Sequence, residues 1–300
     1  MCRTGALLVV SALLVTAEVH RHPKGEVIPH EKYIGVVSET DSPVQKHYIA
    51  SKDGLYIAAA IRKPKGLGPF PALIYFHGAP GGRGMEKLVT WSLGATGGPL
   101  WERLLQEGYA VIVADYRRIP GQYILSPVES AGPTTYVEDG EAVLDFVRSL
   151  PYVGKNRIAV YGVSLGGNLA AYLVSRQKVA AAVFGAGAVN GFLHASRPPA
   201  GATPGTFKVQ FDEAAALKNI AGITCPVLAL VGTEDPFMGI NEVFHDLLIK
   251  SGKAAHLHIY EGGYHDFVAG PQGHQGRSEP LLTSTLDALE VTLAFLKKRM

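Results

Sequence analysis

The feature that most constrains the fold is a series of short apolar runs, each bounded by Gly, Pro or Asp. Runs of this kind are typical of parallel strands buried on both faces of a sheet. They occupy residues 72–76, 110–114, 158–161, 180–184, 227–231 and 255–260. Stretches with helical periodicity lie between or after them, at residues 100–107, 135–149, 165–175, 211–220, 241–251 and 281–298. This alternation predicts an α/β fold, in which a mostly parallel central sheet carries helices on both faces.

An antiparallel hairpin is expected at the N-terminal edge of this sheet. Residues 44–50 and 55–62 alternate apolar and polar side chains on either side of Ser51-Lys52-Asp53-Gly54, a sequence suited to a turn. No change in composition marks a second domain, so residues 44–300 are expected to form one domain. A Pro- and Gly-rich piece predicts a small excursion near residues 192–219 that overhangs the sheet.

The first residues have the pattern of an export signal. After Arg3 the chain is apolar almost throughout to Ala17, where small residues suit a signal peptidase. An N-terminal membrane anchor is the alternative, but a spanning helix needs about 20 apolar residues, and the polar stretch from Glu18 ends this one early. We therefore expect a signal peptide at 1–17, an N-terminal extension at 18–43, and a periplasmic or secreted protein without a stable membrane anchor.

Composition argues against several classes of function. The net charge is only +2, and the longest basic run is residues 297–299, so a nucleic-acid-binding surface is not expected. Cys2 and Cys225 are the only cysteines, too few for a disulfide framework or a cysteine zinc site.

The histidines of the chain show no pattern typical of a metal site. His20, His22 and His30 show no recognised ligand spacing, while His256 and His258 fall within a predicted strand. The spacing of these histidines therefore does not indicate a metal site.

A nucleophile motif stands at the centre of the chain. Gly162-Val163-Ser164-Leu165-Gly166 follows the predicted strand 158–161 and opens the next helix. In such an elbow the serine lies on a strained turn, so bulky residues two positions away on either side would clash. The helix N-terminus also favours developing negative charge. Ser164 is therefore the candidate nucleophile.

A serine hydroxyl needs a base and a group that orients the base. Asp235, with Glu234 as the second choice, follows the strand 227–231, and His265 follows the strand 255–260. Asp266 is a further candidate acid, but a residue next to His265 in a loop points poorly at its ring. The chain order Ser164, Asp235, His265 is the order found in α/β hydrolases.

Two backbone N–H groups are expected to bind an oxyanion. The first is that of Leu165, directly after the nucleophile. The second should come from the loop after the strand 72–76, where Ala79 is the better candidate and Gly78 the alternative, because Pro80 has no N–H. Neither this loop nor any other that follows a strand has a phosphate-binding motif.

Together these motifs resemble the α/β-hydrolase superfamily, close to dienelactone-hydrolase-like esterases and the catalytic domain of prolyl-oligopeptidase-type peptidases. The resemblance covers roughly residues 44–298 and implies an acyl-enzyme mechanism with Ser164, His265 and Asp235, and no metal or organic cofactor. The motifs are His-Gly-Ala-Pro-Gly-Gly at 77–82, Ala-Asp-Tyr-Arg at 114–117, Gly-Val-Ser-Leu-Gly at 162–166, Gly-Thr-Glu-Asp at 232–235 and Gly-Tyr-His-Asp-Phe at 263–267.

Two departures from these relatives narrow the expected activity. Dienelactone hydrolases proper use a cysteine nucleophile, whereas this chain has Ser164, and Cys225 precedes Pro226 at a strand start. The oligopeptidase-type enzymes carry a propeller before the hydrolase domain, and fewer than 45 residues precede the first predicted strand here. We expect a serine esterase acting on a small-molecule carboxylic ester. A peptidase or amidase, or a non-catalytic binding module of the same fold, is the alternative.

Overall fold

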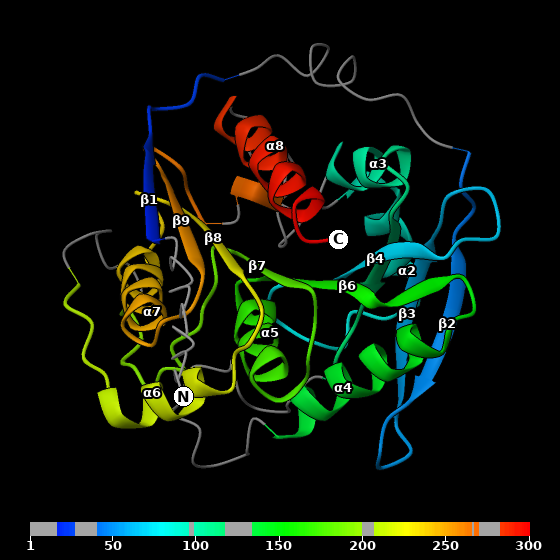
Figure 1. Cartoon of the computed structure of the whole chain (residues 1–300), viewed down its shortest axis with the longest axis horizontal. Helices are drawn as coiled ribbons and strands as arrows, with labels where there is room; N and C mark the ends of the chain where they lie inside the picture. Colours follow the sequence, from blue (N-terminus) through cyan, green and yellow to red (C-terminus); the bar gives the residue numbers. More distant parts are fainter. Residues whose placement is uncertain are drawn as a thin grey trace, which may run out of the picture.

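A nine-stranded sheet forms the centre of the molecule (Figure 1). The computed structural model describes residues 17–27, 41–95, 99–117, 134–199, 207–265, 267–269 and 283–300. The strand order across the sheet is β1-β9-β8-β7-β6-β4-β5-β3-β2. The strands are β1 (Ala17–His22), β2 (Gln45–Ala50), β3 (Tyr56–Arg62), β4 (Phe70–Phe76), β5 (Ala110–Ala114), β6 (Val153–Val163), β7 (Ala181–Gly185), β8 (Val227–Gly232) and β9 (Ala255–Tyr260).

The pairing confirms the predicted α/β architecture. Neighbouring strands from β1 to β5 in the sheet order are parallel, and β3 alone among the described strands runs in the opposite direction to the others. The predicted hairpin is β2 and β3, which pair antiparallel from Gln45↔Ile61 to Ala50↔Tyr56. The hairpin therefore closes one edge of the sheet, as the alternating pattern indicated.

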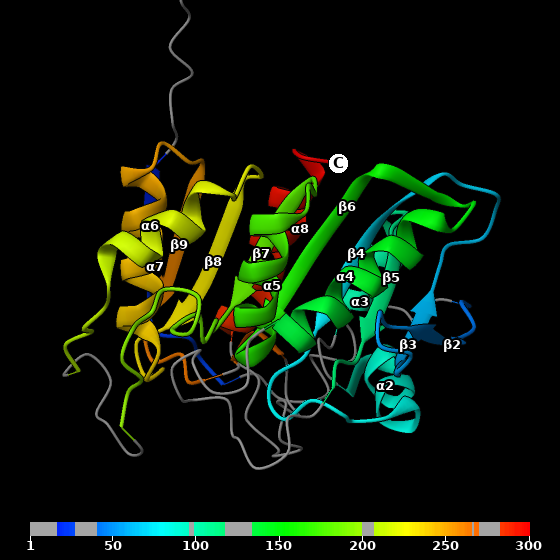
Figure 2. The same ribbon diagram turned by 90° about the horizontal axis from the view of Figure 1, so that it is seen from below.

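Helices cover both faces of the sheet. In Figure 1 α4, α5, α6 and α7 lie on one side of the strands, and α3 and α8 lie on the other. Figure 2, turned by 90°, shows the strands side by side from β9 to β2. The helical segments are α2 (Met85–Thr90), the π-helical η1 (Trp91–Ala95), α3 (Pro99–Gln106), α4 (Thr134–Ser149), α5 (Leu165–Arg176), α6 (Glu213–Ala221), α7 (Met238–Lys250), the short η2 (Phe267–Ala269) and α8 (Thr283–Lys297).

The two helical layers explain why the core strands read as continuous apolar runs. Every residue of β5, β7 and β8 is buried. Successive side chains of one strand enter opposite cores: Ile74 belongs to the cluster on the α5 side, and Leu73 and Tyr75 belong to the cluster on the α8 side. Because neither face meets water, the alternation of a half-exposed strand is lost.

Three elements differ from the sequence analysis. No helix was predicted at α2 or η1, whose helical stretches are too short for a clear periodicity. No strand was predicted at β1, in the stretch assigned to an N-terminal extension. β1 pairs in parallel with β9, with Glu18 opposite His256 and His20 opposite His258. An edge strand is half-exposed, so its polar sequence carries little strand signal.

Most of the predicted signal peptide lies outside the described residues, as does part of the predicted excursion. The described part of that excursion contains a single bridge between Ala195 and Phe211, followed by α6. Within the described ranges, none of the helices combines the length and the apolar character needed to cross a lipid bilayer.

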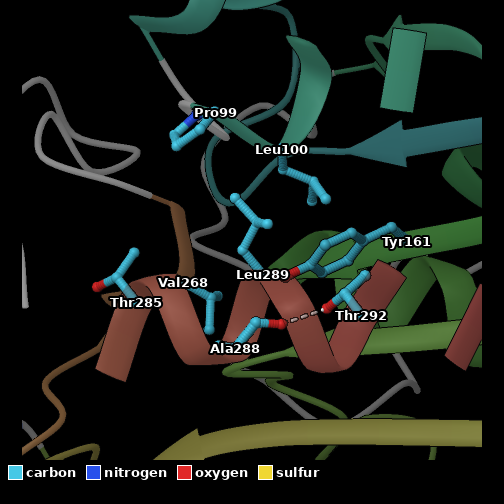
Figure 3. Close-up of a pocket in the computed structure, with 8 residues that line it drawn as sticks. All are labelled: Pro99, Leu100, Tyr161, Val268, Thr285, Ala288, Leu289 and Thr292. Atoms are coloured by element: carbon cyan, nitrogen blue, oxygen red, sulfur yellow. Dashed lines mark hydrogen bonds between the residues drawn. The ribbon is translucent and has the colours of Figure 1, made fainter. Parts of the chain in front are cut away.

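A small cavity remains between α3, α8 and β6 (Figure 3). It measures about 10 Å³, which is close to the space that one water molecule needs. In Figure 3 the Thr292 hydroxyl lies at the cavity and donates to the carbonyl of Ala288 at 2.7 Å. The lining residues are Pro99, Leu100, Tyr161, Val268, Thr285, Ala288, Leu289 and Thr292. This cavity is a packing space and is too small for an organic substrate.

The loops after β8 and β9 touch through their backbones. A Cβ atom built on Gly232 would lie 1.9 Å from the carbonyl oxygen of Gly263 and 2.6 Å from its Cα. The N–H of Glu234 donates to the same carbonyl at 2.9 Å, and that of Thr233 donates to Tyr260 at 2.9 Å. Only glycine at position 232 permits this approach.

We therefore expect Gly232→Ala to lower the free energy of unfolding by about 1–3 kcal/mol, because backbone must move to admit the methyl group. Gly187→Ala is the matched control, since its Cβ would meet ordinary contacts of 3.4 Å. Urea denaturation of both variants measures the difference. Equal stability of the two variants would show that the contact at Gly232 does not constrain the fold.

Candidate active site

Ser164 lies in the sharp turn between β6 and α5 that the sequence predicted. Its backbone has φ 50° and ψ −119°, a conformation that residues other than glycine rarely adopt. Three hydrogen bonds hold it there. The Ser164 carbonyl accepts from the N–H groups of Gly167 and Ala188, both at 2.9 Å, and the Ser164 N–H donates to Gly185 at 3.2 Å. The surrounding backbone thus fixes a strained serine, as is common at functional sites.

The glycines on either side of Ser164 are sterically required. A Cβ on Gly162 would lie 2.3 Å from the carbonyl oxygen of Gly166. A Cβ on Gly166 would lie 2.1 Å from the carbonyl oxygen of Phe76 and 2.5 Å from that of His77. The second contact also places the start of α5 directly against the end of β4, where the loop with Ala79 begins.

Ser164, His265 and Asp235 form one chain of hydrogen-bonding distances. His265 Nε2 lies 3.0 Å from Ser164 Oγ, and His265 Nδ1 lies 3.0 Å from each carboxylate oxygen of Asp235. With its proton on Nδ1, the ring donates to Asp235 and leaves Nε2 free to accept the serine proton. The structure therefore brings the three predicted residues together from three different loops.

Asp235 is oriented by its own loop. Its side chain is fully buried, and one carboxylate oxygen accepts from the N–H of Phe237 at 2.8 Å. The ring of Phe237 lies 5.4 Å from that of His265. The His265 side chain is 26% exposed, so the imidazole lies between the buried carboxylate and solvent.

The second choice for the acid lies elsewhere. Glu234 is exposed and its N–H donates to Gly263, so it is Asp235 that faces the His265 ring. Asp266, the third candidate, lies outside the described residues.

The two predicted oxyanion donors flank the serine in the fold. Leu165 is the first residue of α5, and the N–H groups of a first helical turn have no acceptor within the helix. Ala79 lies three residues beyond the end of β4, in the loop that begins against Gly166. Both residues thus stand on segments adjacent to Ser164.

Asp115, just past the end of β5, holds the loop that carries Ala79. Its carboxylate accepts from the N–H of Gly82 at 2.9 Å and from that of Gly84 at 2.8 Å. His77 Nε2 lies 3.1 Å from the same carboxylate. Burial acts to raise the pKa of Asp115, but these hydrogen bonds to the ionised form outweigh it and leave the pKa below its usual range.

The sequence indicated no role for Asp115 itself, although this residue lies in the motif Ala-Asp-Tyr-Arg at 114–117. The motif alone does not indicate the partners in the loop, because Gly82 and Gly84, whose N–H groups Asp115 binds, lie more than thirty residues earlier in the chain. The motif was therefore visible in the sequence, but the role of Asp115 in holding the loop became clear only from the fold.

Cys225 is placed where it cannot replace Ser164. It precedes β8 at the amino end of the strand, whereas Ser164 follows the carboxyl end of β6. The thiol is buried, and burial raises its pKa to about 12. A thiol with this pKa is protonated at neutral pH and is a poor nucleophile.

Comparisons with known proteins agree with this geometry. An esterase from the archaeon Pyrobaculum calidifontis superposes with a TM-score of 0.62 at 22% identity, covering 89% of each chain. A protein described as a dienelactone hydrolase from Klebsiella pneumoniae gives a TM-score of 0.61 at 20% identity, covering 86% of this chain and 99% of the other. These similarities establish the α/β-hydrolase fold.

A curated relative matches over a shorter stretch. The quorum-quenching protein AidA of Acinetobacter baumannii is 32% identical over 97 residues. The match spans 32% of this chain and only 28% of the length of the Acinetobacter protein.

The family model described as the dienelactone hydrolase family matches residues 57–299. The match begins in β3 and ends after α8, so it includes the strands from β3 to β9 and all three residues of the hydrogen-bonded chain. With the α/β-hydrolase fold already established, this coverage shows that the chain belongs to the dienelactone hydrolase family and is a hydrolase.

Proposed function

We propose that this protein is a serine hydrolase that cleaves small-molecule carboxylic esters through an acyl-enzyme intermediate. The observation that carries the proposal is the chain Ser164, His265, Asp235, in which each step spans 3.0 Å. Nucleophile, base and orienting carboxylate are thus within hydrogen-bond reach of each other. A non-catalytic binding module would have no need of a strained serine aligned with a histidine.

In the first half of the proposed reaction, Ser164 Oγ attacks the ester carbonyl carbon as His265 Nε2 takes the hydroxyl proton. Asp235 remains ionised and stabilises the imidazolium that forms. The carbonyl oxygen becomes an oxyanion and accepts hydrogen bonds from the N–H groups of Leu165 and Ala79. The intermediate then expels the alcohol, which receives the proton from His265.

In the second half, water attacks the acyl group on Ser164. His265 takes a proton from this water, the C–O bond to Ser164 breaks, and the serine oxygen regains the proton from His265. The carboxylic acid leaves and the enzyme returns to its starting state. No metal or organic cofactor is needed for either half.

Asp115 is proposed as a positioning residue for this reaction. It holds Gly82 and Gly84, which lie on the loop that presents the Ala79 N–H. An oxyanion donor contributes most when it is fixed before the charge develops. The carboxylate of Asp115 supplies this fixation without touching the substrate.

The first test is the Ser164→Ala variant. Wild type is expected to hydrolyse nitrophenyl esters and a lactone, and to gain the mass of one fluorophosphonate at Ser164. The variant is expected to lose labelling and to fall by about 10⁶-fold in kcat, because the nucleophile is absent. Intact-protein mass spectrometry and ester assays provide both readouts.

Full turnover by Ser164→Ala would overturn the mechanism. A folded wild type that is neither labelled nor active would instead favour the binding module. Matched anilide substrates address the peptidase or amidase alternative, since an amide leaving group needs a proton before it departs. The proposal requires that the ester be cleaved faster than the matching anilide.

The acid is tested by Asp235→Asn with Glu234→Gln as its matched control. Both changes remove one carboxylate from the same loop. We expect Asp235→Asn to lower kcat by about 10³–10⁴-fold, because the imidazolium loses its buried counter-charge and its orientation. Glu234→Gln is expected to leave kcat at the wild-type value. A larger loss in Glu234→Gln than in Asp235→Asn would reassign the acid.

We also propose that residues 1–17 direct export and are removed after Ala17. In support of this, β1 spans Ala17–His22, so cleavage would leave Glu18–His22 available to pair with β9. The expected N-terminal residue of protein recovered from the periplasm or medium of its native host is Glu18, as read by peptide mass spectrometry. A mature chain that retains residues 1–17 would contradict the proposal.

A further inference from the structure

A ladder of five side chains joins the edge strand β1 to β9, away from the residues proposed for catalysis. It consists of Glu18, His20, His22, His256 and His258. Glu18, His20 and His22 occupy alternate positions on β1, and His256 and His258 occupy alternate positions on β9. The register sets Glu18 opposite His256 and His20 opposite His258. Side chains at alternate positions point to one face of a sheet. All five therefore lie on the same face.

This face is the one covered by α8. Asp287 of α8 lies 3.2 Å from His22 Nδ1, and the ring of Phe295 lies 6.1 Å from that of His256. His256 is the second residue of β9, whereas His265 follows the carboxyl end of the strand. Glu18 and His256 thus meet at the amino end of β9, whereas the hydrogen-bonded chain of Ser164 lies beyond its carboxyl end.

Three side chains of the ladder converge on one point. Glu18 Oε2 lies 3.1 Å from His20 Nε2 and 3.3 Å from His256 Nδ1. The three candidate ligand atoms all lie within 4.8 Å of one another. Ligands at the corners of a zinc tetrahedron, with bonds of 2.0–2.1 Å, are about 3.3 Å apart. Two of the three distances between ligand atoms, 3.1 and 3.3 Å, are therefore close to those expected around one zinc ion.

We propose that Glu18, His20 and His256 bind one divalent transition-metal ion of the zinc type, and that this ion clamps β1 to β9. Two imidazoles and a carboxylate suit zinc rather than magnesium, which prefers oxygen ligands alone. Two ligands come from β1 and one from β9, so the ion bridges the strands. With three protein ligands, a fourth position remains for water.

The neighbouring groups hold the ligands in place. The ring of His20 stacks on that of His258, with centroids 4.4 Å apart and planes at 26°. His258 Nδ1 in turn lies 2.7 Å from His22 Nε2, and His22 contacts Asp287. Such outer contacts fix the orientation of metal-binding imidazoles. These contacts therefore orient the ring of His20 in the absence of a metal ion.

The site is open to ions from solvent on the β1 side. The side chains of Glu18 and His20 are 52% and 43% exposed, while that of His256 is 16% exposed. His256 is the most buried of the three ligands, and its Nδ1 faces Glu18 Oε2. The predicted signal-peptide cleavage precedes Glu18, so the mature chain would keep all three ligands.

The test is calorimetric titration of chelator-treated full chain with ZnCl₂, and with MgCl₂ for comparison. We expect one Zn²⁺ per chain and no binding of Mg²⁺ at the same concentrations. Glu18→Gln and His256→Gln are each expected to weaken zinc binding by more than about tenfold, since each removes a ligand. Arg21→Gln is the matched control, because it removes an ion pair of β1 with Glu242 on the opposite face and is expected to keep the wild-type affinity.

Hydrogen exchange separates this site from zinc bound elsewhere on the chain. Zinc is expected to slow exchange of the β1 amides in wild type and in Arg21→Gln, but not in His256→Gln, with circular dichroism confirming that each variant is folded. The proposal fails if wild type binds no zinc, if Glu18→Gln and His256→Gln bind it as wild type does, or if bound zinc leaves β1 exchange unchanged.

Discussion

Backbone-to-backbone packing at the carboxyl edge of the sheet is the constraint on which the rest of the site depends. Gly162 meets the carbonyl of Gly166, Gly166 meets that of Phe76, and Gly232 meets that of Gly263, all at separations that exclude a Cβ atom. Through these contacts the ends of β4, β6, β8 and β9 converge. Groups from distant parts of the chain can then be placed to within a hydrogen-bond length.

This packing also makes a strained serine tolerable. A backbone conformation such as that of Ser164 costs about 1–3 kcal/mol and persists only where the surroundings determine it. Here the hydrogen bonds from Gly167 and Ala188 to the Ser164 carbonyl, and from Ser164 to Gly185, provide that support. The strained conformation points the Ser164 hydroxyl toward His265. The rigid backbone around Ser164 therefore fixes the position of its Oγ.

Two buried carboxylates serve the same edge in different ways. Asp235 faces the ring of His265 and is oriented by the N–H of Phe237. Asp115 faces backbone N–H groups of Gly82 and Gly84 and fixes a loop. Each is buried and fully engaged in hydrogen bonds, as an ionised group inside a protein must be. Asp235 orients the proposed base His265, and Asp115 fixes the loop that carries the proposed oxyanion donor Ala79.

Much of this was predictable from the sequence because it is local. Short apolar runs, the glycines around Ser164 and the acid and histidine after two later strands each carry their signal within a few residues. Parallel topology then brings the carboxyl ends of the strands to one edge. The fold class, the hairpin and the three residues of the hydrogen-bonded chain therefore followed from pattern and spacing alone.

The role of Asp115 and the contact between His22 and His258 were decided only by the tertiary structure, because the partners in each contact lie far apart in the chain. Asp115 has no visible role until the loop at Gly82 folds back on it. His22 and His258 are 236 residues apart, and neither has a recognisable ligand spacing. They meet because β1 adds to the free edge of β9 in a specific register, and a register between distant strands is set by packing rather than by local sequence.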